Sequence, residues 1–578
     1  MPDAATWPAM SLDQANGLLT QPGAMFEIET LTINGAPIRT YKNAPPTLRH
    51  VFDMSAAFGD RELLIYEDER ISFVAHQKAA ARFAHVLADR FGVQKGDRVA
   101  IIMRNYPQWS IAFWGALLAG AIATPMNAWW TGEELEYGLN DSGAKVAIVD
   151  PKLFERIRDH WDNIEGLSDI VIARAEEDRA DPRVHRMEDF IGAASSWAAL
   201  DPIDPPEVAF EPDDDATIMY TSGTTGRPKG ALATHRAIVS NVFNSLACQM
   251  RMFLRRGEQP PEPDPDNPRI SLVSIPFFHA TGAFAVLVPS MLTGGRMITM
   301  YKWDADAALP IIERERVSAI GGVPAIAWQV LEHPDRDKYD LSSIAAVSYG
   351  GAPSAPELVS TIKRRVPEAV AGNGWGMTET CATATLNFGE DYVNRPDSAG
   401  APSPATELKV VGANGETLGV GEVGELWCRS SSNCKAYWNN PEASAKTFVD
   451  GWVVTGDLAR LDDEGFVYLV DRAKDMLIRG GENIYSIEVE SALYDHPSVM
   501  DAAIVGIPHR VLGEEVGAVV QLKPDTTASE DDLRHHVAQH LAAFKVPKAV
   551  IFMDQPLPRN ANGKVMKTEL RKLFTPTE

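Results

Sequence analysis

The 578-residue chain is poor in cysteine, with four residues of this type. Four cysteines cannot form the disulfide framework that stabilises small secreted proteins, and no CxxC or HExxH pattern indicates a zinc site. The sequence begins MPDAATWPAM, without the basic region and the apolar run of a secretory signal peptide. The sequence therefore predicts a cytoplasmic protein.

Long hydrophobic runs are also scarce. The run that comes nearest to a membrane span, Trp109–Met126, has 18 residues without a charge, about the minimum for a spanning helix. It is rich in Ala and Gly and is interrupted by Gly120 and Pro125. We expect a buried helix that ends near Ala119, a glycine turn and a short strand, and no transmembrane segment.

Positive charge is the third deficit. The 54 Lys and Arg residues are outnumbered by 79 Asp and Glu residues, which gives a formal net charge of −25. Proteins that coat nucleic acid need clustered Lys and Arg, so nucleic acid is excluded as a general partner. Anionic small molecules are not excluded, because their sites are local. A hydrophobic content of 45% is typical of a globular protein with a large core.

Short β-branched runs alternate with helical stretches through most of the chain. Such alternation, with nearly continuous apolar strands, predicts parallel sheet covered by helices on both faces, an α/β fold. The predicted strands are Arg98–Met103, Lys145–Val149, Asp169–Ala173, Ile270–Ile275, Ser318–Val323 and Ile344–Tyr349, and the predicted helices include Phe73–Phe91 and Ala355–Val366.

The pattern of glycines and apolar residues changes after about Val410. Glycine turns separate alternating β-runs there, which favours antiparallel sheet, and the end of the chain returns to mixed α and β. Two segments rich in proline and acidic residues, Asp201–Asp215 and Arg256–Pro268, are typical of surface loops.

The segment Tyr220–Gly230, YTSGTTGRPKG, is the most informative glycine-rich stretch. Glycines let a backbone approach phosphates closely, and successive N–H groups form an anion cradle. The Walker pattern fails, because Pro228 stands where glycine is required and Gly230 stands where Ser or Thr is required. A dinucleotide-binding GxGxxG is also absent, because Met377 takes the place of the third glycine. Composition alone leaves a phosphate cradle and a plain flexible loop both open.

Six motifs, in order along the chain, resemble those of the adenylate-forming superfamily, which includes acyl-CoA synthetases, aryl-CoA ligases, luciferases and peptide-synthetase adenylation domains. The resemblance covers about residues 50–567 and is closest to fatty-acid or aryl-acid CoA ligases. The motifs are YTSGTTGRPKG at 220–230, GGAP at 350–353, NGWGMTE at 373–379 with Trp375 in place of the usual Tyr, TGD at 455–457, DRAKD at 471–475 with GGENI at 480–484, and PRNANGK at 558–564. A GYWN-like motif departs from the family, with Ala436 before Tyr437.

The resemblance implies a fold and a reaction. The expected fold has a large N-terminal domain (residues 1–471) of parallel sheets flanked by helices plus a small β-barrel-like subdomain, and a small mobile α+β C-terminal domain (472–578). The expected reaction has two steps: a carboxylate attacks the α-phosphate of ATP to give acyl-AMP and pyrophosphate, and the CoA thiol then displaces AMP. Mg²⁺ is the implied cofactor, and ATP and CoA are the co-substrates.

The resemblance also implies residue roles. Lys564 would bridge the carboxylate and the α-phosphate, Thr378 would bond the α-phosphate, and Glu379 would bind Mg²⁺. His279 would gate the acyl pocket. Lys474 would be the hinge, and Gly481 would line the CoA channel. The implied ATP- and AMP-binding residues are Thr221, Ser222, Gly223, Thr224, Thr225, Gly226, Lys229, Gly351, Ala352, Pro353, Gly374, Trp375, Gly376, Met377, Thr378, Asp457 and Arg472.

Each of these roles has a plainer alternative that the sequence leaves open. Lys564 can be a solvated lysine in a basic segment, and Thr378 can be a helix N-cap. Gly481 can be an ordinary turn glycine, and His279 can be a satisfied core histidine. Asp457 and Arg472 can be a turn residue and part of a surface ion pair.

The segment around His279 bears on the substrate. Amino-acid-activating relatives place an Asp directly after the Phe of this segment, whereas His279 follows Phe278 here. A buried ammonium without a partner is strongly disfavoured, so we expect no amino-acid substrate. The candidate pocket residues are small or apolar, which predicts a medium- or long-chain fatty acid or a bulky ring-bearing acid. They are Ala280, Gly282, Ala283, Ala325, Gly351, Cys381 and Ala382.

Two alternatives to a CoA ligase stay open. The chain can be an acyl-AMP ligase that loads a separate carrier protein, or a catalytically inactive relative that binds acyl groups or nucleotides. The retained Lys564, Glu379 and Asp457 favour an active enzyme.

Overall fold

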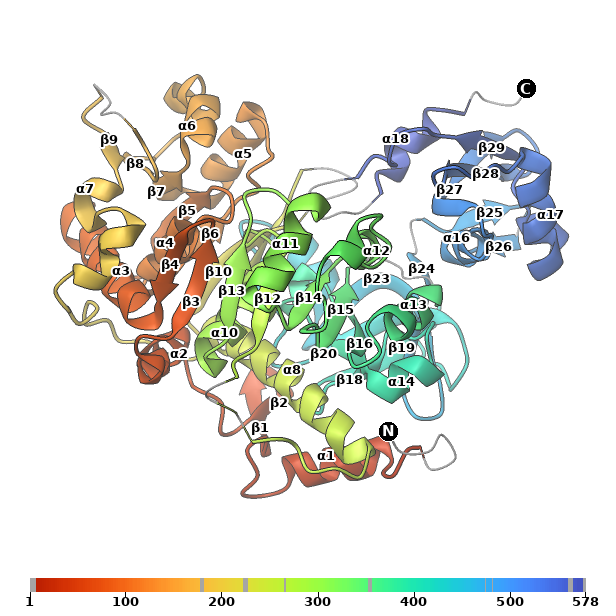
Figure 1. The fold of residues 1–578 in the computed structure, drawn as a ribbon, viewed down its shortest axis with the longest axis horizontal. Helices are drawn as coiled ribbons and strands as arrows, with labels where there is room; N and C mark the ends of the chain where they lie inside the picture. Colours follow the sequence, from red (N-terminus) through yellow and green to blue (C-terminus); the bar gives the residue numbers. More distant parts are fainter. Residues whose placement is uncertain are drawn as a thin grey trace.

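Two mixed sheets with helices against their faces form most of the molecule, and a smaller unit follows at the C-terminal end of the chain (Figure 1). The computed structural model describes residues 7–176, 181–221, 227–262, 264, 267–351, 356–472, 475–480, 482–559 and 565–574. The predicted α/β fold, with parallel sheets flanked by helices, is confirmed.

The first sheet has eight strands in the order β21-β11-β10-β6-β5-β7-β8-β9. The run from β10 to β9 is parallel, and β11 and β21 add antiparallel pairs at one edge. Strands of this kind are covered on both faces, which explains their nearly continuous apolar sequence. Their bounds are β5 (Arg98–Ile102), β6 (Ile122–Pro125), β7 (Ala144–Val149), β8 (Asp169–Ile172), β9 (Val184–Arg186), β10 (Asp215–Tyr220), β11 (Gly230–Thr234) and β21 (Ala436–Tyr437).

The second sheet has nine strands in the order β18-β17-β16-β15-β14-β12-β13-β3-β4. The six strands from β16 to β3 in this order form a parallel run, and β4, β17 and β18 pair antiparallel at the edges. Their bounds are β3 (Glu62–Tyr66), β4 (Glu69–Ser72), β12 (Ile270–Val273), β13 (Arg296–Thr299), β14 (Ala319–Gly322), β15 (Ala346–Gly350), β16 (Val370–Trp375), β17 (Thr385–Phe388) and β18 (Ala401–Pro402).

Helix α4 (Pro107–Leu118) shows why the uncharged run at 109–126 is not a membrane span. Every residue of α4 is buried, Gly120 turns the chain with φ 80°, and β6 follows. No helix within the described residues is long and apolar enough to cross a membrane. The prediction for this segment is confirmed.

The remaining helices of the body cover the sheets. Their bounds are α1 (Leu12–Thr20), α2 (Leu48–Met54), α3 (Phe73–His85), α5 (Gly132–Ser142), α6 (Pro151–Arg158), α7 (Glu188–Ile191), α8 (His235–Arg255), α9 (Ala280–Gly282), α10 (Val288–Thr293), α11 (Ala305–Glu315), α12 (Pro324–Leu331), α13 (Glu357–Arg365), α14 (Gly389–Asn394) and α15 (Pro441–Thr447). A hairpin of β1 (Ile28–Ile33) and β2 (Ala36–Tyr41) lies near α1 (Figure 1).

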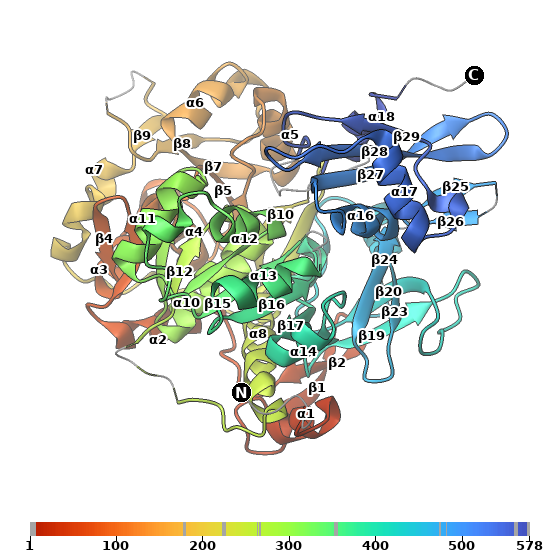
Figure 2. The same cartoon turned by 45° about the vertical axis from the view of Figure 1, so that its right-hand side comes forward.

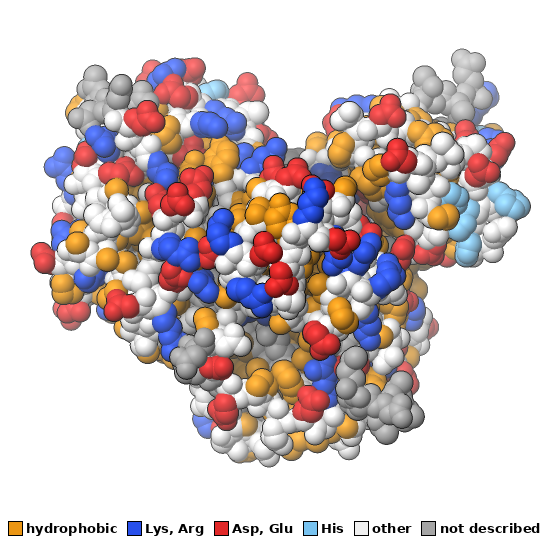
Figure 3. Space-filling model, in the orientation of Figure 1, with side chains coloured by type: hydrophobic (Ala, Val, Ile, Leu, Met, Phe, Trp, Pro, Cys, Tyr) orange, Lys and Arg blue, Asp and Glu red, His pale blue; other side chains and the backbone are white. Residues whose placement is uncertain are grey.

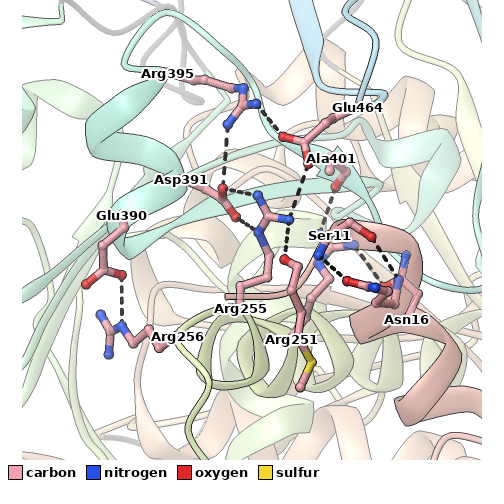
Figure 4. Close-up of polar contacts among 12 residues, drawn as sticks. Ser11, Asn16, Arg251, Arg255, Arg256, Glu390, Asp391, Arg395, Ala401 and Glu464 are labelled. Carbon is pink, nitrogen blue, oxygen red and sulfur yellow. Dashed lines mark hydrogen bonds and ion pairs between the residues drawn. The ribbon is translucent and has the colours of Figure 1, made fainter. Parts of the chain in front are cut away.

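Helix α8 runs through the core and ends in a buried ionic network (Figure 4). The Arg255 side chain is fully buried; its Nη2 donates to Asp391 Oδ1 of α14 at 2.7 Å, and its Nη1 donates to the Met10 carbonyl at 3.1 Å. Glu464, in the turn after β23, lies 3.5 Å from Arg255 Nη1. The network joins the start of the chain, α8, α14 and this turn.

A curled antiparallel sheet follows the two mixed sheets, in the region where the sequence predicts antiparallel strands and a barrel-like subdomain. Its order is β19-β20-β23-β22, with β24 paired to β23. The bounds are β19 (Glu407–Val411), β20 (Gly424–Arg429), β22 (Phe448–Val449), β23 (Trp452–Leu461) and β24 (Val467–Arg472). The antiparallel prediction is confirmed.

The small unit after β24 has its own sheet and its own apolar core, which includes Leu477, Val489 and Ile504. Figure 2 shows it above the curled sheet, and Figure 3 shows a notch between it and the lobe that carries α5 and α6. Its elements are β25 (Leu477–Arg479), β26 (Glu482–Ile484), α16 (Ser486–Tyr494), β27 (Val499–His509), β28 (Gly513–Leu522), α17 (Glu530–His540), β29 (Ala549–Phe552) and α18 (Lys567–Arg571).

Candidate active site

Several predicted site residues of the body lie at the carboxyl ends of parallel strands. Thr221 comes directly after β10, and Gly351 directly after β15. Trp375 ends β16, whose Gly374 is paired with Gly350 of β15. In open α/β sheets this is the edge at which ligands bind. The sheet topology therefore gathers motifs that are far apart in sequence.

The two ends of the glycine-rich loop are held together by antiparallel pairing. β10 pairs with β11, and the Thr221 N–H donates to the Lys229 carbonyl at 2.9 Å. On the other side, β11 pairs with β21, so that Tyr437 lies opposite Ala231. The Lys229 ammonium lies 4.8 Å from the centre of the Tyr437 ring. The fold thus places the loop's lysine beside Tyr437.

Glu379 lies next to this lysine–tyrosine pair. It sits in a short 3₁₀ turn, Thr378–Thr380, and is buried. The Tyr437 hydroxyl donates to Glu379 Oε1 at 2.5 Å. Burial and the Glu379 carboxylate raise the pKa of Tyr437, so the phenol stays protonated and remains a donor. The carboxylate is held in a fixed orientation and keeps lone pairs for a further ligand.

Two buried cysteines brace the same turn. The Cys434 N–H donates to the Glu379 carbonyl at 2.8 Å, and the Cys434 thiol donates to the Thr378 carbonyl at 3.3 Å. Cys381 Sγ lies 3.8 Å from Cys434 Sγ, and both thiols are free. The contact with Cys381 and burial raise the pKa of Cys434, which keeps it a thiol. Its observed role is to hold Thr378 and Glu379 in place.

Gly376 is required by a close backbone approach. A Cβ at this position would lie 1.9 Å from the Ala382 carbonyl oxygen, so any side chain would push the turn that contains Glu379 away. Gly351 needs its glycine for a different reason, since its φ of 74° is left-handed. Both positions therefore favour glycine.

Asp457 is fixed by two donors. It lies on β23 opposite Arg472 of β24, whose Nε is 3.1 Å from Asp457 Oδ1. The indole N–H of Trp375 donates to Asp457 Oδ2 at 2.8 Å. Asp457 is buried, and each of its oxygens retains a lone pair for another donor. The structure therefore brings Trp375, Asp457 and Arg472 together.

Asn241 of α8 connects the segments that follow His279 and Glu379. Its Nδ2 donates to the Phe284 carbonyl at 2.9 Å, and its Oδ1 accepts from the Thr383 N–H at 3.0 Å. His279 itself is half-buried, precedes α9 and packs edge-on against Phe278, with ring centres 4.5 Å apart. α8 is thus the common support of both segments.

Comparison with known proteins decides the family. A model of the AMP-binding enzyme family matches residues 52–438, more than half of the chain, and a model of the AMP-binding enzyme C-terminal domain matches residues 488–564. The chain belongs to the AMP-binding enzyme family. The predicted resemblance and the predicted enzyme class, an AMP-forming acid–thiol ligase, are confirmed at this level.

Individual members of the AMP-binding family agree. A feruloyl-CoA synthase of Amycolatopsis is 34% identical over 504 residues, which cover 87% of this chain and 94% of the relative. The long-chain-fatty-acid–CoA ligase FadD13 of Mycobacterium tuberculosis is 35% identical over 512 residues, 88% and 94% of the two chains. The crystal structure of the anthranilate CoA ligase AuaEII with anthranoyl-AMP has a TM-score of 0.78 at 25% identity, and covers 90% of this chain and 96% of that one.

Part of the AMP-binding site predicted from the sequence lies outside the described residues. The residues concerned are Ser222, Gly223, Thr224, Thr225, Gly226, Ala352, Pro353, Lys474, Gly481 and Lys564. Their roles stay predictions. Within the described part of the chain, Thr221, Lys229, Thr378 and Glu379 form one group around Tyr437, and Trp375, Asp457 and Arg472 form a second group that is joined to the first through Gly376 and Met377.

Three residues that the structure places at this candidate site have no role predicted from the sequence: Tyr437, Cys434 and Asn241. The signal for Tyr437 was the GYWN-like motif in which it stands. Cys434 and Asn241 had no local signal, because their contacts join segments more than 40 residues apart.

A second cluster lies close to Phe278. We call Arg104, Trp129, Lys152 and Tyr301 the cation–aromatic patch. Arg104 stacks over Trp129 at 4.8 Å and over Tyr301 at 5.5 Å, and Lys152 Nζ donates to the Tyr301 hydroxyl at 3.1 Å. Trp129 also packs edge-on against Phe278, with ring centres 6.1 Å apart. The patch joins cations to an exposed tryptophan and a half-buried tyrosine beside the segment of His279.

Proposed function

We propose that the chain is an ATP-dependent carboxylic acid–CoA ligase that makes an acyl-AMP and pyrophosphate and then an acyl-CoA and AMP. The observation that supports it is that Lys229 and Glu379 lie together beside Tyr437 and that the Asp457 carboxylate is oriented by Trp375 and Arg472, in a member of the AMP-binding family. A cation, a fixed carboxylate and a buried carboxylate suit the phosphates, the metal and the ribose of ATP, respectively.

We propose Glu379 as the Mg²⁺ ligand. Magnesium prefers hard oxygen donors and keeps several waters, so that one carboxylate with ATP phosphates is sufficient. The fixed, buried Glu379 carboxylate fits this requirement. Within the described residues, no group of three or more His, Cys, Asp or Glu side chains could hold a metal ion. When bound, Mg²⁺ would neutralise phosphate charge as the α-phosphate is attacked.

The first step needs charge neutralisation and a positioned carboxylate. We assign Lys564 to bridge the acid and the α-phosphate, and Thr378 to bond the α-phosphate. Asp457 would accept from the ribose hydroxyls, with Arg472 beside it. His279 would stand near the acid. Support for the group at Asp457 comes from the Trp375 and Arg472 contacts that already orient its carboxylate.

We divide the chain into an N-terminal domain (1–471) and a mobile C-terminal domain (472–578) with its hinge at Lys474. The separate apolar core of the small unit supports this division. The small domain would present Lys564 for the first step and Gly481, in the CoA channel, for the second.

We infer that the acid is a medium- or long-chain fatty acid or a bulky ring-bearing acid. By their names, the relatives described above act on feruloyl, long-chain fatty and anthranilate groups. No carboxylate stands beside His279 to pair with a substrate ammonium, since its neighbours are Phe278 and Ala280.

For the thiol acceptor we infer CoA, and we assign its phosphate-bearing nucleotide to the cation–aromatic patch. Arg and Lys bind phosphate, and exposed aromatic faces stack on a base. The patch offers both within a chain whose net charge is −25. An acyl-AMP ligase that loads a carrier protein, or an inactive relative, is the alternative.

A panel of carboxylic acids, read by pyrophosphate release and by acyl-CoA formation, tests this function. We expect turnover with medium or long fatty acids or ring-bearing acids. In the double variant Arg104→Ala/Lys152→Ala we expect KM for CoA to rise about tenfold, and KM for dephospho-CoA to change less, because a phosphate contact is lost. Best kcat/KM with acetate or propionate would refute the substrate class, and acyl-AMP without acyl-CoA would favour carrier loading.

A further inference from the structure

Asp471 links the body of the molecule to the small unit. It lies on β24, directly before Arg472, and only 2% of the residue is exposed. Asp471 accepts a hydrogen bond from the Ser486 N–H and another, at 3.0 Å, from the Ser486 hydroxyl. Because Ser486 is the first residue of α16, these contacts cross from β24 of the body to a helix of the small unit.

Lys567 extends this contact towards the end of the chain. It is the first residue of α18, and its Nζ donates to the Ser486 hydroxyl oxygen at 2.6 Å and pairs with Glu490 Oε1 at 2.7 Å. Glu490 is fixed in turn, because its Oε1 accepts from the Ile504 N–H at 2.9 Å. We call Asp471, Ser486, Lys567 and Glu490 the Lys567 bridge.

The charges of the Lys567 bridge are mutually dependent. Burial alone would lower the pKa of Lys567, but the carboxylates of Glu490 and Asp471 raise it. Burial raises the pKa of Asp471 to about 6, and Lys567 and the Ser486 donors oppose that rise. The charge of the Lys567 ammonium therefore stabilises two carboxylates, and its removal would leave the negative charges of both without this partner.

The position of the Lys567 bridge in the chain matters for the proposed reaction. Lys567 comes three residues after Lys564, and Asp471 comes three residues before Lys474. Asp471 is also next to Arg472, which contacts the candidate ribose ligand Asp457 at 3.1 Å. A continuous series of contacts thus runs from the ribose site to the start of α18.

We propose that Lys567 is a positioning residue, which holds the small unit against Asp471 in the pose that serves acyl-AMP formation. The inference rests on the proposed function, in which the small domain turns about Lys474 between two poses. Asp471 belongs to the body, whereas Ser486 and Lys567 belong to the small unit. The hydrogen bonds between Asp471 and Ser486 are the contacts of the bridge that cross the hinge, so a rotation about Lys474 would break them. The Lys567 bridge therefore favours one pose over the other.

The test separates the two half-reactions in the full-length enzyme. In Lys567→Met we expect acyl-AMP formation, read by pyrophosphate release without CoA, to fall about tenfold, the scale of one lost hydrogen bond to a charged group. Thioester formation from supplied acyl-AMP and CoA should stay within about twofold. Lys567→Arg should restore most of the first step, because it keeps the charge.

Two further variants keep the test sharp. Ser486→Ala removes the linking hydroxyl without leaving Lys567 unpaired, and should show the same selective loss on a smaller scale. Lys572→Met removes an exposed lysine of the same C-terminal segment, which pairs with Glu569, and should change neither step. The thermal midpoint of each variant shows whether it is folded.

The outcomes are distinct. Equal loss of both half-reactions in folded Lys567→Met and Ser486→Ala, or a selective loss of the thioester step, overturns the positioning role. Lys564→Ala tests the proposed function separately: if it forms acyl-AMP normally, the role of Lys564 fails, whatever the Lys567 variants show. A loss in Lys564→Ala with no loss in Lys567→Met retains the function and rejects the positioning role.

Discussion

At the scale of single residues, the buried Asp457 carboxylate shows how the site is prepared before a ligand arrives. Its two oxygens already accept from Trp375 and pair with Arg472. The sequence shows Trp375 as a departure from the usual Tyr, but not what the departure does. The structure gives the reason, because the indole N–H reaches Asp457 at 2.8 Å.

Trp375→Phe removes this donor and keeps an aromatic ring. We expect KM for ATP and Kd for AMP to rise about tenfold, because a hydrogen bond to a charged group stabilises by about 1.5–3 kcal/mol. Initial rates and calorimetry measure the two constants. Trp427→Phe is the matched control: it removes an indole donor to Glu425 at 3.2 Å on β20, and its ring lies against Lys409 instead of Asp457. Equal values of KM for ATP in the Trp375 and Trp427 variants would contradict the role of Trp375.

Residue types that recur in a motif were predictable, and supports drawn from distant segments were not. Glu379 and Asp457 stand in motifs, and in the structure each is a buried carboxylate that accepts a hydrogen bond from an aromatic side chain. The donor to Glu379 comes from Tyr437, 58 residues away, through the pairing of β21 with β11. A contact of this kind depends on sheet order, which local sequence does not specify.

At the scale of elements, α8 contacts the candidate site near its start and a buried ionic network at its end. Asn241 near its start holds the segments after His279 and Glu379, and Arg255 at its end holds the ionic network of Figure 4. The glycine-rich loop does not lead directly into α8. The structure inserts β11 first, because Gly230–Thr234 pairs with both β10 and β21.

Arg255→Met tests this end of α8. The change leaves Asp391 buried without its main partner, and breaking a buried ion pair costs about 3–5 kcal/mol. We expect a clear fall in the urea midpoint of unfolding, which intrinsic tryptophan fluorescence measures. Lys446→Met is the control, because its pair with Glu442 is largely exposed and such pairs contribute about 0–1 kcal/mol. Similar midpoints for the two variants would show that the network adds little.

The strands were predicted better than the edges of the sheets. The apolar runs at 98–103, 145–149 and 169–173 correspond closely to β5, β7 and β8, because strands buried on both faces keep a continuous apolar sequence. The short edge strands β21 and β18, of two residues each, had no such pattern. Their pairing comes from the position of their neighbours.

At the scale of the whole molecule, buried histidines set the response to acid. Burial lowers the pKa of His235 to about 4 and that of His76 to about 3. Both are neutral in the folded state, and His235 Nδ1 accepts from the Leu48 N–H at 3.3 Å. In the unfolded chain a histidine takes up its proton near pH 6.5, so between pH 6.5 and 4 the unfolded state binds more protons.

Stability should therefore fall as the pH drops through this window, by about 1.4 kcal/mol per pH unit for each histidine. We expect His235→Gln to lose some stability at pH 7.5 but to have a shallower fall between pH 6.5 and 4. Urea midpoints over a pH series measure the slope. His535→Gln, on an exposed face of α17, is the control. Parallel curves for wild type and His235→Gln would contradict the assignment.

The four free cysteines are all buried, and this has a practical consequence. Burial raises the pKa of Cys248, and that of Cys428 to about 12, while the contact with Cys381 and burial raise that of Cys434. Maleimide dyes react with thiolates, so these native thiols stay nearly silent at neutral pH. Val420, between β19 and β20, and Val511, between β27 and β28, are 67% and 82% exposed. Cysteines introduced there would accept a fluorophore pair, and energy transfer between the two dyes would measure the proposed movement of the small domain.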